Sequence, residues 1–361
     1  MPIKPPRLCF GDTIGIIAPA SAPPDPKAID QSIAVLERLG FKPRLARNVR
    51  KRWGFLAGSD RDRAADLMQM FTDRKVKAVI CVRGGYGTAR ILPLLDYDAI
   101  RRNPKILIGY SDITSLHCAF LIKSNLVSFH GPMLNSDFIK DKFPDFTLNG
   151  FLRTLMEPAP AGSLLNYSSS SSPAAPTCPA IASERRRKPL SGGGSSIPPP
   201  ANRRTPKAHK QATPRAPSCV RSGVVTGPLL GGNLSILCTT LGTPYQPSFK
   251  NRILFFEDLA EIPYRFDRML THLLNAGVLQ QVAGIAIGIN ANCRDPNARK
   301  AKEYRQTMDD VIKERLLPLK VPIVSGLPFG HIPINATLPI GIKAKLDADA
   351  VDLQIIESAV L

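Results

Sequence analysis

The sequence predicts an α/β fold in which two domains flank a stretch of low complexity. Residues 1–157 alternate between strand-like and helical patterns, and buried strands return in 223–361. Between them, residues 158–222 have almost no apolar periodicity. Strands that alternate with helices are typical of a parallel sheet covered on both faces. A chain of 361 residues, 43% of them hydrophobic, is long enough for two cores.

The first predicted domain, 1–157, opens with a β-rich run and an amphipathic helix. Apolar residues at Ile29, Ile33 and Leu36 recur at helical spacing, and Gly40 ends the pattern. The elements expected here are, in chain order, a strand at 13–20, helices at 27–40 and 60–73, strands at 77–85 and 105–112, and a helix that follows Asp112.

The second predicted domain, 223–361, is richer in continuous apolar runs. Such runs are typical of strands that are buried on both faces. The tail alternates apolar and polar residues, which predicts a hairpin at 337–356. The other elements expected are strands at 252–258, 282–290 and 321–328 and a helix at 304–318.

The segment 158–222 has a different composition from its flanks. It holds twelve of the 34 prolines and ten Lys or Arg against one acid, so it supplies +9 of the net charge of +19. Such a composition buries too little apolar surface to offset the entropy of ordering, so we expect a disordered basic linker. Basic segments can bind nucleic acid, but Tyr167 is its only aromatic residue. A passive insertion is therefore favoured over a nucleic-acid arm.

Several classes of protein are excluded by simple patterns. No apolar run reaches 18 residues, so no transmembrane helix is expected. The N-terminal residues lack the apolar stretch of a secretory signal. The seven cysteines form no CxxC pair and no zinc-like spacing, which favours free thiols in a reducing compartment, the cytoplasm. We expect neither a metal nor a cofactor.

Ser111 is the first candidate for chemistry. It follows an apolar strand in the run Ile-Gly-Tyr-Ser-Asp-Ile-Thr and precedes a helical pattern. A serine at a sharp strand-to-helix turn projects its hydroxyl above the sheet, as in the G-x-S-x-G elbow, although Ile113 replaces the second glycine here. The alternative is that Ser111 or Asp112 only caps the helix.

A glycine-rich run, 83–90, ends another predicted strand. As a dinucleotide fingerprint it fails, because Arg90 stands where the last glycine is required. Two consecutive glycines, Gly84 and Gly85, can instead expose backbone N–H groups that stabilise an oxyanion. A tight turn without a function remains the alternative.

Serine catalysis requires a base and a carboxylate that orients it. Of the five histidines, His130 and His331 lie outside helical patterns and outside the linker, and His331 follows a strand in a Gly/Pro-rich loop. Glu257 ends the strand at 252–258, where open α/β sheets place their sites. The chain order Ser, Glu, His is used for acyl transfer on other folds.

Seven motifs together resemble the LD-carboxypeptidases of serine-peptidase family S66, which includes the microcin C self-immunity peptidases. They are GDTIGIIAPAS, CVRGGYGTARILPLLDY, IGYSDIT, FHGPM, GPLLGGNLSIL, ILFFEDLAEIPYRFDRML and GLPFGHIPINATLPIG. The resemblance spans 1–157 and 223–361 but not the segment between them. It implies a flavodoxin-like domain followed by a swivelling β/α domain, and commonly a homodimer.

The same resemblance implies an activity and a set of site residues. The activity is release of terminal D-alanine from murein tetrapeptide during peptidoglycan recycling in the cytoplasm. The nucleophile falls on Ser111, the base on His331 and the orienting carboxylate on Glu257. The implied oxyanion donors are the N–H groups of Gly85 and Asp112. Arg83 and Arg265 are candidates for binding the free carboxylate of the substrate.

Three other interpretations stay open. A microcin-immunity-type peptidase would act on a peptidyl-nucleotide, but it needs an aromatic platform and the chain has a single tryptophan, Trp53. A nucleic-acid-binding protein would use 158–222. A homologue inactivated by that unusual segment is the third possibility.

Overall fold

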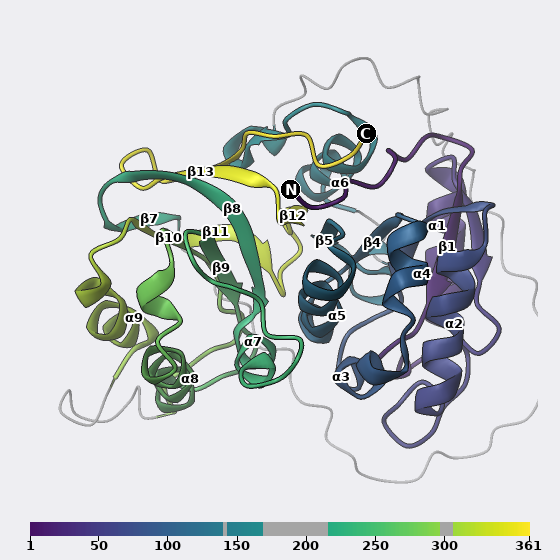
Figure 1. Ribbon diagram of the computed structural model, residues 1–361, viewed down its shortest axis with the longest axis horizontal. Helices are drawn as coiled ribbons and strands as arrows, with labels where there is room; N and C mark the ends of the chain where they lie inside the picture. The colour runs from purple at the N-terminus through teal and green to yellow at the C-terminus, as the bar shows by residue number, and fades with distance from the viewer. Residues whose placement is uncertain (140–142, 169–215, 297–305) are drawn as a thin grey trace, which may run out of the picture.

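The computed structural model describes residues 1–139, 143–168, 216–296 and 306–361. The described chain builds two sheets that lie side by side in two lobes (Figure 1). Buried apolar side chains from both lobes form one continuous cluster. The two sheets are therefore packed on a shared core, and each lobe fixes the position of the other.

The N-terminal lobe is built on a sheet with the order β12-β5-β4-β3-β1-β2. The part β2-β1-β3-β4-β5 is parallel and has the flavodoxin-like order, with a reversal between β1 and β3. Ligand sites in such sheets lie beyond the carboxyl ends of the strands at that reversal. The strands are β1 (Thr13–Ile17), β2 (Lys42–Leu45), β3 (Val76–Cys81), β4 (Ile106–Gly109), β5 (Ser128–His130) and β12 (Leu338–Ile340).

Helices cover this sheet as the amphipathic patterns predict. In α2, Ser59 accepts a hydrogen bond from the Asp62 backbone N–H and Asp62 reaches back to Ser59, so a capping box starts the helix. The helices are α1 (Lys27–Arg38), α2 (Asp60–Thr72), α3 (Thr88–Ile91), α4 (Tyr97–Arg102), α5 (Thr114–Ala119) and α6 (Asp145–Met156). Over the described ranges, no helix combines the length and the apolar character needed to cross a bilayer.

The C-terminal lobe contains the larger sheet, with the order β6-β14-β13-β8-β9-β10-β11-β7. Its centre, β8-β9-β10-β11, is parallel, and antiparallel strands complete both sides. The strands are β6 (Gly162–Ser163), β7 (Ser218–Arg221), β8 (Val224–Asn233), β9 (Ile253–Glu257), β10 (Gly284–Ile289), β11 (Ile323–Gly330), β13 (Lys343–Asp347) and β14 (Asp352–Ile355). The helices are α7 (Leu234–Thr240), α8 (Pro263–Asn275) and α9 (Met308–Leu316).

The predicted α/β fold and its buried strands are confirmed, but the tail differs from prediction. Only β13 and β14 form the expected hairpin. The strand before them, β12, crosses to the N-terminal lobe and pairs antiparallel with β5 (Figure 1). Alternation of apolar residues identifies a strand but does not say which sheet it joins. Leu338 and Ile340 are buried here, as they would be in a hairpin with β13, so the sequence pattern could not predict which sheet this strand joins.

The predicted linker also differs at its two ends. Residues 162–168 form β6 and a 3₁₀ turn, and 218–221 form β7, which pairs with β11. Leu164 and Tyr167 are fully buried, because these few apolar side chains reach the shared core. The expectation of disorder is thereby restricted to 169–215, which lie outside the described residues.

Candidate active site

Loops from both lobes enclose a cavity of about 410 Å³ beyond the carboxyl ends of the strands. This is where the reversal of strand order between β1 and β3 leads one to expect a ligand. From the N-terminal lobe it is lined by Arg83, Gly84, Gly85, Tyr110, Ser111, Met133 and Ser136. From the C-terminal lobe it is lined by Asn233, Ser235, Ile236, Asp258, Leu259, Glu261 and His331.

A hollow of about 500 Å³ lies elsewhere, around Asn48 and Asp66 on the N-terminal lobe. None of the predicted site residues lines it. Its Asp66 carboxylate is already bonded to the side chain and backbone N–H of Asn48. The cavity between the lobes, which holds the candidate nucleophile and base, is therefore the stronger site.

Ser111 occupies the sharp turn that follows β4. Its φ is 63°, a left-handed conformation that is uncommon for a residue with a side chain and that clusters at functional sites. A single 3₁₀ turn, Ser111–Ile113, then leads into α5. Neither helix start has a side-chain cap, and the Asp112 carboxylate instead accepts the Thr88 backbone N–H at 2.8 Å. The capping interpretation is thus not supported, and the elbow geometry is.

The two glycines after β3 allow the backbone to pass directly beside Ser111. A Cβ on Gly84 would lie 2.8 Å from the Ser111 Cβ and 3.2 Å from the Asp112 backbone nitrogen. Gly85 has a φ of 109°, and a Cβ there would lie 2.4 Å from the Ser21 hydroxyl oxygen. Both positions therefore require glycine, and the backbone amides of this loop and of Asp112 are brought next to the serine.

His331 and Glu257 form a bonded pair on the opposite wall. The His331 Nδ1 lies 2.6 Å from the Glu257 Oε2, and Glu257 is fully buried at the end of β9. Burial lowers the pKa of His331, but the charge and hydrogen bond of Glu257 more than offset it, so the pKa is raised above 6.5. The His331 ring contacts Tyr110, the neighbour of Ser111, edge to face at 4.9 Å between centroids. This arrangement leaves Nε2 available to accept a proton.

Three hydrogen bonds join the N-terminal and C-terminal lobes near the cavity. The Asn233 backbone N–H donates to the hydroxyl of Thr114, three residues after Ser111, at 3.0 Å. The buried Thr147 hydroxyl on α6 donates to the Pro333 carbonyl and accepts the Asn335 N–H, both at 2.8 Å. The loop that carries His331 is thus tied to a helix of the other lobe.

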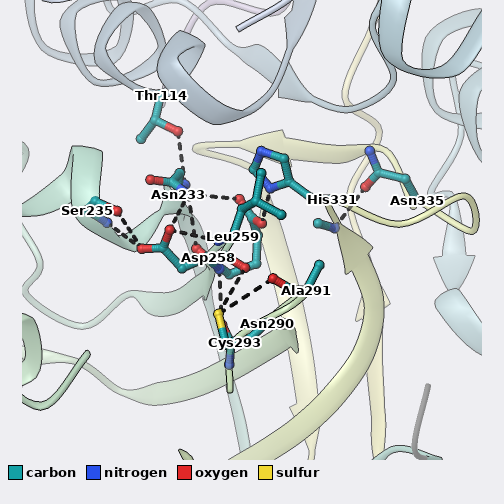
Figure 2. Close-up of polar contacts among 12 residues, drawn as sticks. Thr114, Asn233, Ser235, Asp258, Leu259, Asn290, Ala291, Cys293, His331 and Asn335 are labelled. Carbon is teal, nitrogen blue, oxygen red and sulfur yellow. Dashed lines mark hydrogen bonds and ion pairs between the residues drawn. The ribbon is translucent and has the colours of Figure 1, made fainter. Parts of the chain in front are cut away.

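A polar network that the sequence did not predict is bonded to Glu257, the partner of His331. Asn233 donates its side-chain NH₂ to Asp258 at 3.0 Å and, at 3.4 Å, to Glu257. Ser235 donates its backbone N–H and its hydroxyl to the other Asp258 oxygen, at 2.9 and 2.6 Å (Figure 2). The available signal was an Asn-x-Ser run directly after Gly-Gly at a strand end, together with an acid next to Glu257.

The other three histidines in the described ranges do not line the cavity. His117 is buried and bonded to the Ser128 hydroxyl and the Gly109 carbonyl, both at 2.9 Å, and burial lowers its pKa to about 4. His130 is also fully buried, and neither of its ring nitrogens has a partner among the described residues. His272 is exposed on α8.

The two predicted carboxylate-binding arginines have different positions. Arg83 lines the cavity beside Gly84 and Gly85, and its guanidinium donates to the Ala22 carbonyl at 3.4 Å. Arg265 is exposed on α8 and is not among the lining residues. Of the two arginines, only Arg83 therefore lines the cavity that also holds Ser111 and His331.

Models of the peptidase S66 family match residues 14–131, as the LD-carboxypeptidase N-terminal domain, and 226–346, as the C-terminal domain. A probable murein peptide carboxypeptidase of Bacillus subtilis (strain 168) is 36% identical over 344 residues, which cover 95% of this chain and 91% of the relative.

Two solved structures have the same fold. The first, of MccF in complex with glutamyl sulfamoyl guanosine, has a TM-score of 0.79 and 26% identity, and all of both chains is covered. The second, of a muramoyltetrapeptide carboxypeptidase from Oxalobacter formigenes, has a TM-score of 0.72 and 29% identity, with 95% of this chain and 97% of that chain covered.

Proposed function

Since this chain belongs to the LD-carboxypeptidase family, peptidase family S66, we propose that it is a serine carboxypeptidase that releases D-alanine from murein tetrapeptide. Membership makes the chain a hydrolase of the carboxypeptidase type. The observation that carries the serine mechanism is one cavity lined by Ser111 in a left-handed turn and by His331 bonded to Glu257.

In this mechanism Ser111 is the nucleophile. Its hydroxyl oxygen attacks the carbonyl carbon that precedes D-alanine while His331 Nε2 accepts the proton. Glu257 holds the Nδ1–H tautomer and stabilises the imidazolium that forms. When the C–N bond breaks, His331 returns the proton to the departing amine. Water, deprotonated by the same histidine, then hydrolyses the acyl-enzyme and restores the serine.

The oxyanion is assigned to the backbone N–H groups of Gly85 and Asp112. This assignment is supported by the close approach of the diglycine loop to Ser111. Because residue 84 is a glycine, no side chain separates the backbone of this loop from Ser111. Fixed N–H donors aimed at developing charge are typically the largest single contribution to acyl-transfer catalysis. Arg83 is the better placed cation for the free carboxylate of D-alanine, and Arg265 remains the second candidate.

The second candidate function is a microcin-immunity-type peptidase acting on a peptidyl-nucleotide. It is favoured by the TM-score of 0.79 with MccF bound to glutamyl sulfamoyl guanosine. Stacking on a nucleobase requires an exposed aromatic face. Tyr110 is the only aromatic residue other than histidine among the described cavity-lining residues, and it is itself buried. We therefore place the murein peptide first, with a cytoplasmic homodimer as the proposed setting.

The deciding experiment offers three substrates to the full chain. These are murein tetrapeptide, the same peptide ending in L-alanine, and a glutamyl sulfamoyl nucleoside. We expect release of alanine from the first peptide and none from the second, with free alanine of either configuration measured by amino-acid chromatography. Turnover of the nucleoside alone would establish the second candidate function and contradict the first.

A further inference from the structure

The charged groups that line the cavity are divided between its two walls. Arg83 is the cation on the wall of the N-terminal lobe. The wall of the C-terminal lobe carries the carboxylates of Asp258 and Glu261, with Glu257 buried behind them. A ligand that fills this space is therefore offered a cation at one side and negative charge at the other.

The carboxylates of Glu257, Asp258 and Glu261 differ in the hydrogen bonds that they already accept. Glu257 is bonded to His331 and Asn233. Asp258 accepts hydrogen bonds from Asn233, Ser235 and the Leu259 backbone N–H. In contrast, the Oε2 of Glu261 is shielded from solvent and has no hydrogen-bond partner among the described residues.

The surroundings leave Glu261 short of compensating charge. Burial, followed by the charge of Asp258, raises the pKa of Glu261. The charges of Arg265 and Arg268 and a hydrogen bond from the Ile262 N–H act in the opposite direction without cancelling the effect. A buried carboxylate oxygen without a donor is costly, and a ligand that brings a donor removes that cost.

Glu261 is also held in place rather than mobile on a surface loop. Its backbone N–H donates to the Cys293 sulfur at 3.3 Å. The same loop is paired with residues after β10, through Asp258 N–H to the Asn290 side chain at 3.0 Å and Ala260 N–H to the Ala291 carbonyl at 2.8 Å (Figure 2). A ligand therefore meets a carboxylate whose backbone is already fixed, which reduces the entropy lost on binding.

We propose that Glu261 is a specificity-determining residue that binds a side-chain ammonium group on the residue preceding D-alanine. This rests on the proposed function, which puts the scissile carbonyl at Ser111 and the terminal carboxylate at Arg83. The side chain of the preceding residue then extends along the opposite wall. An ammonium supplies both the missing donor and the opposite charge, and charge-assisted hydrogen bonds of this kind are the strong ones. An acidic side chain there is repelled by Glu261 and Asp258 together.

The test compares two tetrapeptides that differ by one acetyl group, which removes the charge of the lysine side chain. One ends in L-lysyl-D-alanine and the other in Nε-acetyl-L-lysyl-D-alanine. We expect kcat/KM about tenfold higher for the lysyl peptide, as for one charge-assisted hydrogen bond. Glu261→Gln should bring this ratio close to one through a higher KM for the lysyl peptide. Glu37→Gln, which removes the same charge from the exposed face of α1, is the matched control and should leave the ratio unchanged.

The outcomes separate this inference from the function on which it rests. If both peptides are cleaved equally and Glu261→Gln changes neither, the inference is wrong while the carboxypeptidase function stands. Binding of both peptides to the Ser111→Ala protein, measured by calorimetry, decides the matter without turnover. Equal dissociation constants there would overturn the inference even if neither peptide were hydrolysed, whereas a preference lost in the Ser111→Ala, Glu261→Gln double variant would support it.

Discussion

Ser111, the proposed nucleophile, and His331, the proposed base, are positioned in different ways. Ser111 is positioned by a short continuous segment, β4 and the turn behind it, together with the diglycine loop. His331 is bonded to Glu257, which lies 74 residues away along the chain. Its loop is held by Thr147, which lies 186 residues from Pro333 and 188 residues from Asn335. Segments of the N-terminal lobe alone therefore position Ser111, whereas the position of His331 depends on how the two lobes pack.

The two regions also differ in what stabilises them. The turn at Ser111 holds a left-handed φ, which costs free energy and is kept only because the sheet and α5 determine the chain on both sides. The His331 loop instead depends on satisfied hydrogen bonds between buried groups. Removing the Ser111 hydroxyl should therefore affect chemistry alone, whereas removing the hydrogen bonds that hold the His331 loop should affect chemistry and stability together.

The largest effect is expected from Ser111→Ala. Loss of a nucleophile typically reduces kcat on the order of 10⁴- to 10⁶-fold, and a hydroxyl that faces a cavity contributes little to packing. D-alanine release should therefore disappear while the thermal midpoint stays close to that of the wild type. Ser248→Ala, at an exposed position outside the cavity, is the matched control. Activity above about 1% of wild type in Ser111→Ala would mean that another group is the nucleophile.

The next effect, from Glu257→Gln, tests the base. Removing the orienting carboxylate of a triad lowers kcat on the order of 10⁴-fold. The base works only when neutral, so wild-type kcat/KM should rise with pH through the raised pKa of His331, above 6.5. In the variant the attraction of Glu257 is gone and burial still lowers that pKa, so the acidic limb of the residual activity should move to lower pH.

The control for this shift is Glu314→Gln, which removes an exposed carboxylate that pairs with Arg315 on α9. It should leave both rate and pH profile unchanged. An acidic limb that stays in place in Glu257→Gln would show that the limb does not report His331.

The smallest effect is expected from Thr147→Val. This change tests most directly whether the His331 loop differs from the Ser111 turn in what holds it in place. The change keeps the shape of the side chain but leaves the Asn335 N–H and the Pro333 carbonyl without their partner. We expect unfolding free energy to fall by about 1–3 kcal/mol and kcat to fall about tenfold, because small displacements of a catalytic group are costly. Urea unfolding and steady-state kinetics measure the two effects.

Thr72→Val, whose hydroxyl bonds only within the last turn of α2, is the matched control for packing. It should change neither quantity by much. A loss of stability in Thr147→Val with kcat unchanged would mean that this contact supports the lobe but does not position His331.

Much of the fold was open to prediction because burial repeats at fixed periods. Runs such as 252–258 and 282–290 became β9 and β10, and the helical spacing in 27–40 became α1. The assignment of β12 to the other sheet and the folding of 162–168 could not be predicted, because they depend on which partner surface a short apolar segment meets. The flavodoxin-like order was available only through the family resemblance.

The sequence by itself determined most of the helices and strands and the glycines that follow β3, because apolar periodicity and the backbone freedom of glycine are local properties. Tertiary structure alone decided that Asn233 and Asp258 lie beside Glu257 and that Arg83 lines the cavity while Arg265 does not. It also decided that one Glu261 oxygen has no partner among the described residues. Hydrogen-bond satisfaction and burial depend on neighbours brought from distant parts of the chain, and no local pattern encodes those neighbours.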